Sequence, residues 1–367
     1  MNDDGKFMKR AIELARRTEG SVSPRPPVGA LLVSSDGEVI GEGWDTPSPG
    51  PHAETMALAA ADDKAFGATA FVTLEPCSHT GATAPCADAL IRAGIARVVV
   101  GSTDPNPKVN GQGLAKLREA GIEVSEGVES ESCGELIEPF AKWVREGTPF
   151  VTLKMAASLD GKTAAADGTS MWITGEAARA EVHDLRRRAD AVIVGSMTVL
   201  RDDPLLTCRL EDAEVTQPLR VVIDGSGRTP ETSRVFNDDA PTLVITNDDL
   251  ADVHVDRWIK AGAEVARLAA GESGVDVRAA LSYLGERGIS HALVEGGPTI
   301  AASFIASGLV DRFVLYLAPI LIGGDAPGLF NDGVKTLSDA WGLQIENVRA
   351  VGDDLRIDAR LKPTGDD

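Results

Sequence analysis

The sequence predicts an α/β protein of two domains, and three observations lead to this prediction. The chain has 367 residues, 43% of them hydrophobic, which is long for a single core and enough for two apolar interiors. Helical and strand patterns alternate along the chain, as they do in layered α/β domains. A helical connector, ESESCGELIEPFAKWVREG, separates two such alternations. We therefore place the boundary at Gly147 and expect domains of residues 1–147 and 148–367.

The first domain is expected to begin with the helix KFMKRAIELARRT, whose apolar residues recur at helical spacing. VGALLVSSDGEVIGEG predicts two strands joined at Asp36-Gly37, a dipeptide typical of hairpin turns. HAETMALAAADD predicts a helix, TAFVTLE a strand, and CADALIRAG a helix that starts at Pro85-Cys86 and ends at Gly94. The strands ARVVVG and IEVSEG, with the helix QGLAKLREAG between them, complete this domain.

The second domain is expected to start with the strand PFVTLKMAAS, followed by the helix GEAARAEVHDLRRRA. Its other strands are short apolar runs rich in β-branched residues. They are DAVIVGS, LRVVID, PTLVIT, HALVEGG, FVLYLAPIL and LRIDARL.

The formal net charge of −20 indicates a surface that repels nucleic acid and anionic lipid headgroups, so we expect neither as a partner. An anionic small molecule is not excluded, because a few cations converging in a cleft outweigh diffuse charge at short range.

The start, MNDDGKFMKR, lacks the order of a secretory signal, and no stretch approaches the roughly 20 apolar residues of a membrane span. We expect a cytoplasmic protein.

A histidine and two cysteines in the first domain form a candidate metal site. Of the four cysteines, Cys133 and Cys208 are interpreted as ordinary thiols, whereas Cys77 and Cys86 follow His52 closely and suit metal ligands better than a disulfide. One imidazole and two thiolates suit one Zn²⁺ per chain. Three protein ligands leave the fourth tetrahedral position open for water, as in a catalytic site.

Glu54, two residues after His52, is expected to move protons rather than to bind the metal. The zinc would lower the pKa of a bound water from about 15.7 toward about 7, and Glu54 would carry its proton to a departing amino group. The helix start at Cys86 favours the thiolate. His-x-Glu followed by Pro-Cys is the signature of zinc-dependent nucleobase deaminases. The alternative is a structural zinc clip or two unrelated buried cysteines.

The segment between the cysteines resembles one deaminase family in particular. EPCSHTGATAPC is similar to EPCSHxGxTPPC of the bifunctional riboflavin-biosynthesis deaminase/reductases, departing at Ala84 and at Ala82, where a basic residue is usual. DPNPKVNGQG, residues 104–113, is also similar to a loop of that family. In SPRPPVGALLV, Arg25 replaces the family's asparagine, and we expect it to contact a ring carbonyl or a phosphate of the substrate. His79 is interpreted as either a substrate contact or a loop-ordering residue.

Motifs of the second half follow the order of the reductase half of that family, so the resemblance spans nearly the whole chain. They are KMAASLDGKTA, MWITG, VGSMTVLRDDPLLTCR and VEGGPTIAASF. The resemblance implies a cytidine-deaminase-like α/β/α domain followed by a dihydrofolate-reductase-like α/β domain that uses NADPH. No G-x-G-x-x-G opens a βαβ unit, which disfavours a Rossmann domain.

Two glycine turns are candidate cofactor sites. VEGGP predicts a strand, a glycine turn and a helix start, an arrangement that suits the cofactor pyrophosphate, although an ordinary Gly-Gly turn is the alternative. The residues concerned are Gly297, Pro298, Thr299, Ile300, Ala301, Ala302 and Ser303. A second turn, DGSGR, ends at Arg228, which we expect to select NADPH over NADH through its 2′-phosphate.

The resemblance implies further reductase contacts, position by position. Next to NADPH it places Ala156, Trp172, Thr198, Asp202 and Gly225. Next to the substrate it places Ser170, Arg186, Leu206, Arg209 and Glu295. Forked guanidinium groups suit a phosphate, so Arg186 and Arg209 are expected to bind it, with a solvated helix face as the alternative for Arg186. Lys154 and Asp202 lie in segments near the expected chemistry, and either could handle protons.

The implied function is bifunctional: zinc-dependent deamination of a phosphoribosylated diaminopyrimidinone, then NADPH-dependent reduction of its ribose to a ribityl chain. The ligand is thus a small phosphorylated pyrimidine, and we expect a homo-oligomer, either a dimer or a tetramer. One alternative is a nucleoside or RNA base deaminase fused to a reductase-like domain of other or no activity. Another is that one half is a non-catalytic binding or dimerisation module.

Overall fold

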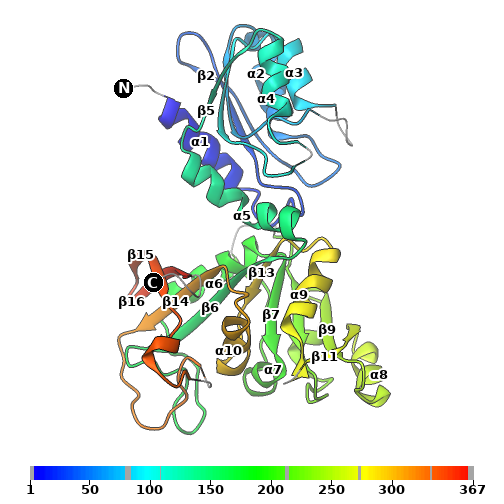
Figure 1. Cartoon of the computed structure of the whole chain (residues 1–367), viewed down its shortest axis with the longest axis vertical. Helices are drawn as coiled ribbons and strands as arrows, with labels where there is room; N and C mark the ends of the chain where they lie inside the picture. The colour runs from blue at the N-terminus through cyan, green and yellow to red at the C-terminus, as the bar shows by residue number, and fades with distance from the viewer. Residues whose placement is uncertain are drawn as a thin grey trace. The chain divides into compact units, whose positions relative to one another are not determined.

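The computed structural model describes residues 4–78, 84–107, 109–210, 215–271, 274–330 and 333–362. The chain divides into two compact units, Met1–Gly147 and Thr148–Asp367, and each is described by itself (Figure 1). His79 and Ala82 lie outside the described residues. Among the helices that the structure describes, none combines the length and the apolar composition needed to cross a bilayer.

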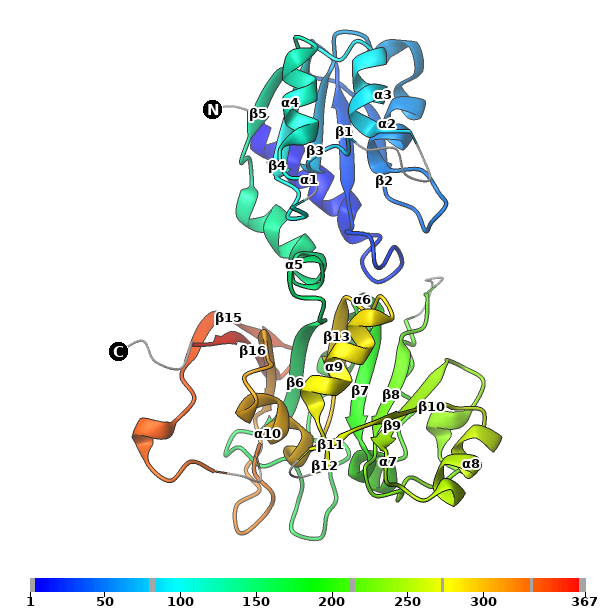
Figure 2. The ribbon, with the colours of Figure 1, turned by 45° about the vertical axis from the view of Figure 1, so that its right-hand side comes forward.

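The first unit is a five-stranded sheet with helices on both faces (Figure 2). Its order is β2-β1-β3-β4-β5, in which β2, β1 and β3 are antiparallel and β3, β4 and β5 are parallel. The strands are β1 (Gly29–Val33), β2 (Val39–Trp44), β3 (Thr69–Leu74), β4 (Arg97–Ser102) and β5 (Glu123–Glu126). One face carries α1 (Asp4–Arg16) and α5 (Ser130–Glu146), and the other carries α2 (Ala53–Ala61), α3 (Cys86–Arg92) and α4 (Gln112–Glu119).

Two glycines of β2 bring α2 close to the sheet. A Cβ at Gly43 would lie 2.1 Å from the carbonyl oxygen of Ala53, and one at Gly41 would lie 2.2 Å from that of Ala57. Only glycine fits at so close an approach of two backbones. The start of α2 is therefore fixed against the end of β2, which matters for the residues that the helix presents.

The second unit is built on a nine-stranded sheet of order β10-β9-β8-β7-β13-β6-β14-β16-β15. From β10 to β14 the strands are parallel, and β14, β16 and β15 are antiparallel. The strands are β6 (Phe150–Ser158), β7 (Ala191–Gly195), β8 (Leu219–Ile223), β9 (Thr242–Asn247), β10 (Glu264–Leu268), β13 (His291–Val294), β14 (Arg312–Ala318), β15 (Leu343–Val351) and β16 (Asp354–Leu361). The helices are α6 (Glu176–Arg188), α7 (Ser196–Asp202), α8 (Asp252–Lys260), α9 (Val277–Glu286) and α10 (Pro298–Ala306).

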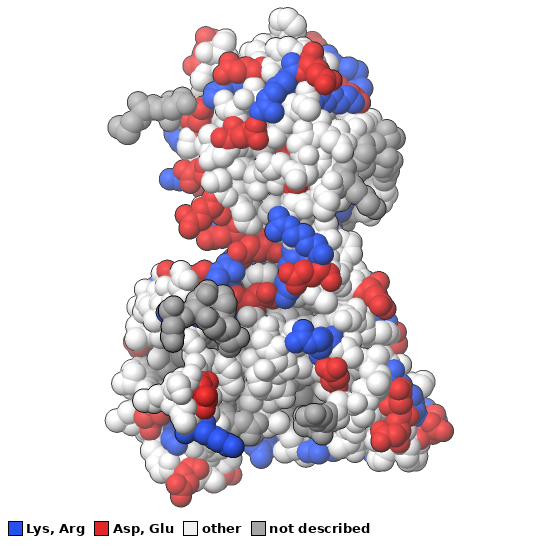
Figure 3. Space-filling model, viewed as in Figure 1, with Lys and Arg blue, Asp and Glu red and all other residues white. Residues whose placement is uncertain are grey.

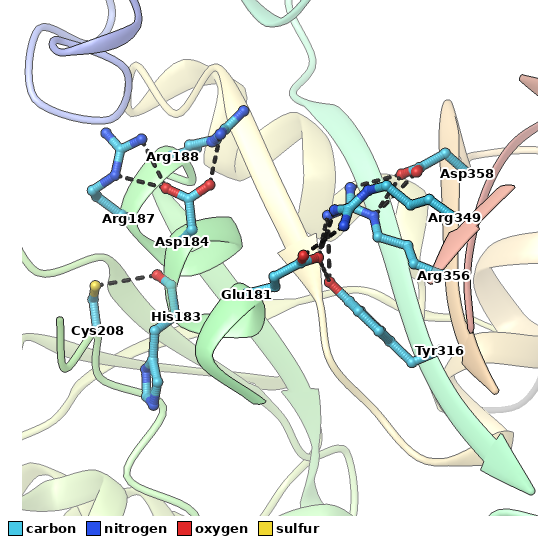
Figure 4. A network of polar contacts seen from close by, with 10 residues as sticks. All are labelled: Glu181, His183, Asp184, Arg187, Arg188, Cys208, Tyr316, Arg349, Arg356 and Asp358. Atoms are coloured by element: carbon cyan, nitrogen blue, oxygen red, sulfur yellow. Dashed lines mark hydrogen bonds and ion pairs between the residues drawn. The ribbon is translucent and has the colours of Figure 1, made fainter. Parts of the chain in front are cut away.

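A polar network anchors the hairpin of β15 and β16 to α6 (Figure 4). Glu181 of α6 accepts hydrogen bonds from both terminal nitrogens of Arg349 at 2.7 Å and from Arg356 at 3.0 Å. The hydroxyl of Tyr316, on β14, donates to the same carboxylate at 3.2 Å. One face of the hairpin is thus held to the body of the unit by half-buried charges and by the exposed Arg349.

The predicted α/β fold class is confirmed, and single elements differ. The strand predicted over FVLYLAPIL ends at Ala318, because Pro319 has no N–H with which to continue a ladder. The sequence pattern does not predict β15, because a bulge between Ile345 and Asn347 interrupts its alternation of apolar and polar residues. The pattern also leaves out α7, α8, α9 and β10.

Candidate functional site

The three predicted metal ligands of the first unit lie together. Their ligand atoms are all within 4.8 Å of one another, the one such group among the residues described. His52 Nδ1 lies 3.8 Å from the sulfur of Cys77 and 3.4 Å from that of Cys86. Tetrahedral zinc with imidazole and thiolate ligands holds nitrogen and sulfur about 3.6 Å apart. The donor set and its spacing therefore fit zinc.

Helix starts and backbone contacts place these ligands. His52 is the N-cap residue of α2, and Cys86 is the first residue of α3. Cys77 follows β3, where its sulfur accepts a hydrogen bond from the Cys86 N–H at 3.3 Å and its carbonyl accepts one from Ala87. Hydrogen bonding with Cys86 and with His52 lowers the pKa of Cys77 to about 4, which favours its thiolate. The hydrogen bond with Cys77 and burial raise the pKa of Cys86, so its helix start alone does not favour a thiolate there.

Glu54 lies in the first turn of α2 and is only 4% exposed. Burial, the neighbouring Asp45 carboxylate and the Cys77 thiolate raise the pKa of Glu54 to about 7. A carboxyl group that titrates near neutrality can both accept and release a proton. The raised pKa of Glu54 thus suits a group that carries a proton.

Asp45 is a residue of this region that the sequence pattern does not single out. Its Oδ1 accepts a hydrogen bond at 2.8 Å from the N–H of Ala53, the residue before Glu54, and burial raises its pKa to about 6. Arg25 lies on the same side, because it donates to the carbonyl of Thr46 and its charge acts to lower the pKa of Asp45. Asp45 thus fixes the start of α2 from outside the helix.

In the second unit, the predicted reductase residues gather at the carboxyl edge of the parallel strands, where open α/β sheets bind ligands. The N–H of Gly297, before α10, donates to Oγ1 of Thr198, in α7, at 3.1 Å. The hydroxyl of Ser170 donates to Asp202, at the end of α7, at 3.2 Å. Gly225 follows β8 at the same edge. Segments far apart in the chain are thus brought together here.

The start of α10 has the features of a phosphate site. The helix begins at Pro298 with Gly297 as its N-cap, and the first N–H groups of a helix have no partners within it. The side chains of Ile300, Ala301 and Ala302 are buried in the core. This segment would therefore meet a ligand through its backbone rather than through those three side chains.

Arg186 and Glu295, both predicted to border the substrate, bind each other. Nε and Nη2 of Arg186 donate to the two carboxylate oxygens of Glu295 at 2.5 and 2.9 Å. Their side chains are 12% and 7% exposed, so the solvated helix face considered for Arg186 is wrong. Burial acts to raise the pKa of Glu295, but Arg186, with Lys154 and His183, outweighs it and the pKa is lowered. Lys154 Nζ lies 4.0 Å from the same carboxylate, and burial lowers its pKa.

Thr207 brings the two predicted phosphate-binding arginines together. Arg186 donates to its carbonyl at 3.1 Å, and Arg209 donates to its hydroxyl at 2.9 Å. Arg209 is exposed, whereas Arg186 is nearly buried and already engaged by Glu295. Of the two guanidinium groups, that of Arg209 is the one open to a ligand from solvent.

The remaining predicted residues differ in how accessible they are. Trp172 is 69% exposed, and the guanidinium of Arg179 lies 4.6 Å from its ring centroid. Leu206 is buried and has a φ of 56°, an uncommon backbone conformation for a leucine. Ala156 lies in β6, and Arg228 donates to the hydroxyl of Ser226 at 2.6 Å within the second glycine turn. Trp172 and Arg228 are therefore exposed and can contact a ligand. Leu206 is buried, and what distinguishes it is its backbone conformation.

Comparison with known proteins accounts for both units. Residues 1–102 match the zinc-binding region of cytidine and deoxycytidylate deaminases, and residues 149–357 match the RibD C-terminal domain. The riboflavin biosynthesis protein RibD of Aquifex aeolicus is 41% identical over 355 residues, covering 96% of this chain and 97% of its own length. That of Escherichia coli is 40% identical over 365 residues, covering 96% and 98%.

Solved structures agree. A Thermotoga maritima protein described as a diaminohydroxyphosphoribosylaminopyrimidine deaminase/5-amino-6-(5-phosphoribosylamino)uracil reductase is 39% identical, with a TM-score of 0.87 over 98% of this chain and 99% of its own. Acinetobacter baumannii RibD is 37% identical with the same TM-score and coverage.

A zinc-binding deaminase region followed by a reductase domain defines a two-domain enzyme that joins a hydrolytic deaminase to an oxidoreductase. The chain belongs to the RibD family of bifunctional riboflavin-biosynthesis deaminase/reductases. The family predicted from the motifs is confirmed, and so are zinc and NADPH as its cofactors.

Proposed function

We propose that the first unit, residues 1–147, deaminates a phosphoribosylated diaminopyrimidinone, and that the second, residues 148–367, reduces the ribose of the product to a ribityl chain. The observation that carries the proposal is the convergence of His52, Cys77 and Cys86 beside the buried carboxyl group of Glu54. The two activities named for the Thermotoga maritima relative, which matches over both units, support this choice of substrate.

In the first unit, zinc held by His52, Cys77 and Cys86 would supply a water of lowered pKa. Glu54 takes a proton from the hydrolytic water and delivers it to the amino group, which leaves as ammonia. Its raised pKa suits it to hold that proton between the two transfers. Arg25, which has only donors to offer, would bind a ring carbonyl or the phosphate.

In the second unit, NADPH would supply a hydride to C1′ of the sugar once its ring has opened. The backbone at the start of α10 would hold the pyrophosphate, with Arg228 at the 2′-phosphate. Arg209 would bind the substrate phosphate, because its guanidinium is the accessible one. Lys154, whose pKa burial lowers, and Asp202, whose pKa burial raises, are the groups placed to hold a proton there.

The test follows ammonia and NADPH in one reaction. Purified protein given the pyrimidinone ribosylamine phosphate should release ammonia without NADPH, and it should oxidise added NADPH in proportion. Removing the metal with a chelator should stop ammonia release but spare NADPH oxidation when the deaminated intermediate is supplied. Ammonia without NADPH oxidation would refute the two-step proposal, and ammonia from cytidine or adenosine instead would favour a nucleoside deaminase.

We further propose a homodimer, or a tetramer built from such dimers, that forms through the edge strand β15. Leu343, Ile345 and Val348 are 42%, 60% and 52% exposed, and their pairing with alternate residues of β16 places them on one face. The other face is held by the Glu181 network. A long apolar edge strand favours pairing with a second copy across a two-fold axis. Light scattering should give a dimer or tetramer mass for the parent and a monomer for Ile345→Lys; a monomeric parent would refute the proposal.

A nucleic-acid partner is not expected, and a cytoplasmic location remains a prediction. On the face drawn in Figure 3, the lysines and arginines of the described residues are scattered among aspartates and glutamates. Nucleic-acid binding favours cations gathered in a patch, so this face supports the expectation from the net charge.

A further inference from the structure

Glu75 is a buried carboxylate that the catalytic scheme leaves without a role. It is 4% exposed and lies between the end of β3 and Cys77. A carboxylate buried in this way is costly unless hydrogen bonds or a cation compensate its charge. Among the residues that the structure describes, no lysine or arginine forms an ion pair with it.

Three backbone N–H groups of a second segment compensate the charge of Glu75. Oε2 accepts hydrogen bonds from Asp104 at 3.2 Å and from Gly111 at 2.9 Å, and Oε1 accepts one from Gly113 at 2.8 Å. The last of these belongs to the first turn of α4, where the helix dipole also favours a negative charge. Bonds from N–H groups to a carboxylate are stronger than those between neutral groups.

A steric contact joins the same segments. A Cβ at Gly113 would lie only 2.0 Å from the carbonyl oxygen of Pro76, which directly precedes Cys77. The backbone N–H of Glu75 also donates to the carbonyl of Ser102, at the end of β4. Glu75 and Pro76 therefore pack directly against the start of α4, and Cys77 is the next residue along the chain.

We propose that Glu75 is a positioning residue for Cys77. By drawing three N–H groups of the segment from Asp104 to Gly113 onto one carboxylate, it fixes the Pro76–Cys77 turn in the geometry that places the Cys77 sulfur near His52 and Cys86. The inference rests on the proposed zinc site. Partners that orient metal ligands commonly raise metal affinity by about 10- to 100-fold.

The experiment measures zinc affinity of the full chain by competition with a chelator. Glu75→Gln keeps the shape of the side chain but turns an amide NH₂ toward N–H donors, so it can no longer accept all three hydrogen bonds. We expect it to bind zinc about 10- to 100-fold more weakly. Glu119→Gln, at the exposed end of α4, is the matched control and should leave zinc affinity unchanged.

A second variant perturbs the Pro76–Cys77 turn without changing the Glu75 carboxylate. Gly113→Ala would push on the carbonyl of Pro76, and we expect it to weaken zinc binding as well. Gly134→Ala is its control, because Gly134 also lies in a helix, α5, and a Cβ there would meet nothing within 4 Å. Should Glu75→Gln fail to fold, Gly113→Ala decides the question.

The outcomes separate this inference from the site on which it rests. A parent chain that binds no zinc, or binds it equally well after Cys86→Ser, would refute the zinc site itself. A parent that binds zinc tightly, with variants that melt at lower temperature yet keep the parental zinc affinity, would show that Glu75 only stabilises the fold and would overturn the inference. NADPH oxidation with the deaminated intermediate supplied should be unchanged in all these variants.

Discussion

The metal site draws its ligands from residues 52–86, whereas the reductase site draws on segments from Lys154 to Ser303. In the first unit two of the three ligands lie at helix starts and the third follows a strand, and hydrogen bonds from backbone N–H groups to side chains hold this region. In the second, the main polar contact is a side-chain ion pair between residues 109 apart in sequence. The comparison teaches that a site whose residues are close in sequence can be predicted from their spacing. A site whose residues come from distant segments, brought together by the sheet, cannot be predicted in this way.

The two sites should also fail in different ways. In the first unit the groups that do chemistry are distinct from those that hold the backbone, so a catalytic residue can be changed without loss of structure. In the second, Arg186 and Glu295 are both expected substrate neighbours and a buried structural pair. Substitutions there should affect activity and stability together.

The largest expected effect is that of Glu54→Gln on ammonia release. Loss of the proton carrier should slow deamination by about 10²- to 10⁴-fold, while zinc content, and NADPH oxidation with the deaminated intermediate supplied, stay at parental values. Glu131→Gln, in the exposed first turn of α5, is the control and should retain full activity. Loss of zinc from the Glu54 variant would contradict the separation of catalytic and structural roles in this unit.

The next largest effect is that of Glu295→Gln on local stability. The change leaves the buried Arg186 charge without its partner, which should cost about 3 kcal/mol. Hydrogen exchange of α6 and β13 should therefore quicken by about two orders of magnitude, together with loss of NADPH oxidation, while the first unit is unchanged.

The matched control is an exposed ion pair of the same unit. Arg287 donates to both carboxylate oxygens of Glu264, but their side chains are 33% and 51% exposed. Glu264→Gln should cost less than about 1 kcal/mol. Equal effects of the two substitutions on stability would show that burial does not strengthen the ion pair of Arg186 and Glu295.

Several residues show why sequence could predict one site more fully than the other. His52, Glu54, Cys77 and Cys86 are recognisable because zinc chemistry restricts both residue type and order. The role of Glu75 was beyond reach, because its three hydrogen-bond donors lie 29, 36 and 38 residues further along the chain. Such partners are plain backbone N–H groups, which no residue type marks.

The second unit shows the same limit at larger separations. Arg186 could be predicted to lie near the substrate only through the family resemblance, and that resemblance does not reveal that its guanidinium group is bound by Glu295. The strand pattern was sufficient for β7, β8, β9 and β13, which are short apolar runs buried on both faces. It failed for β15, whose bulge breaks the alternation on which strand prediction depends.

The smallest expected effect is an acid sensitivity of the second unit that arises from His291. Its Nε2 lies 2.9 Å from the hydroxyl of Thr152, and its Nδ1 lies 3.1 Å from the carbonyl of Arg188. A neutral ring that donates from Nδ1 and accepts at Nε2 satisfies both contacts. Burial lowers the pKa of His291. Asp190 and the hydrogen bond to the Arg188 carbonyl oppose this effect, and the charges of Arg312 and Arg188 add to it.

The sign of this effect follows from where the proton binds. Below the ordinary histidine pKa of about 6.5, the unfolded chain takes up a proton that the folded chain refuses, so the free energy of unfolding falls as the pH falls. One such group contributes a slope of at most about 1.4 kcal/mol per pH unit. Urea unfolding followed by tryptophan fluorescence between pH 7.5 and 5.5 should show a shallower loss in His291→Gln than in the parent. A residual slope is expected from His183, whose pKa burial also lowers, but equal slopes in parent and variant would remove His291 as the source.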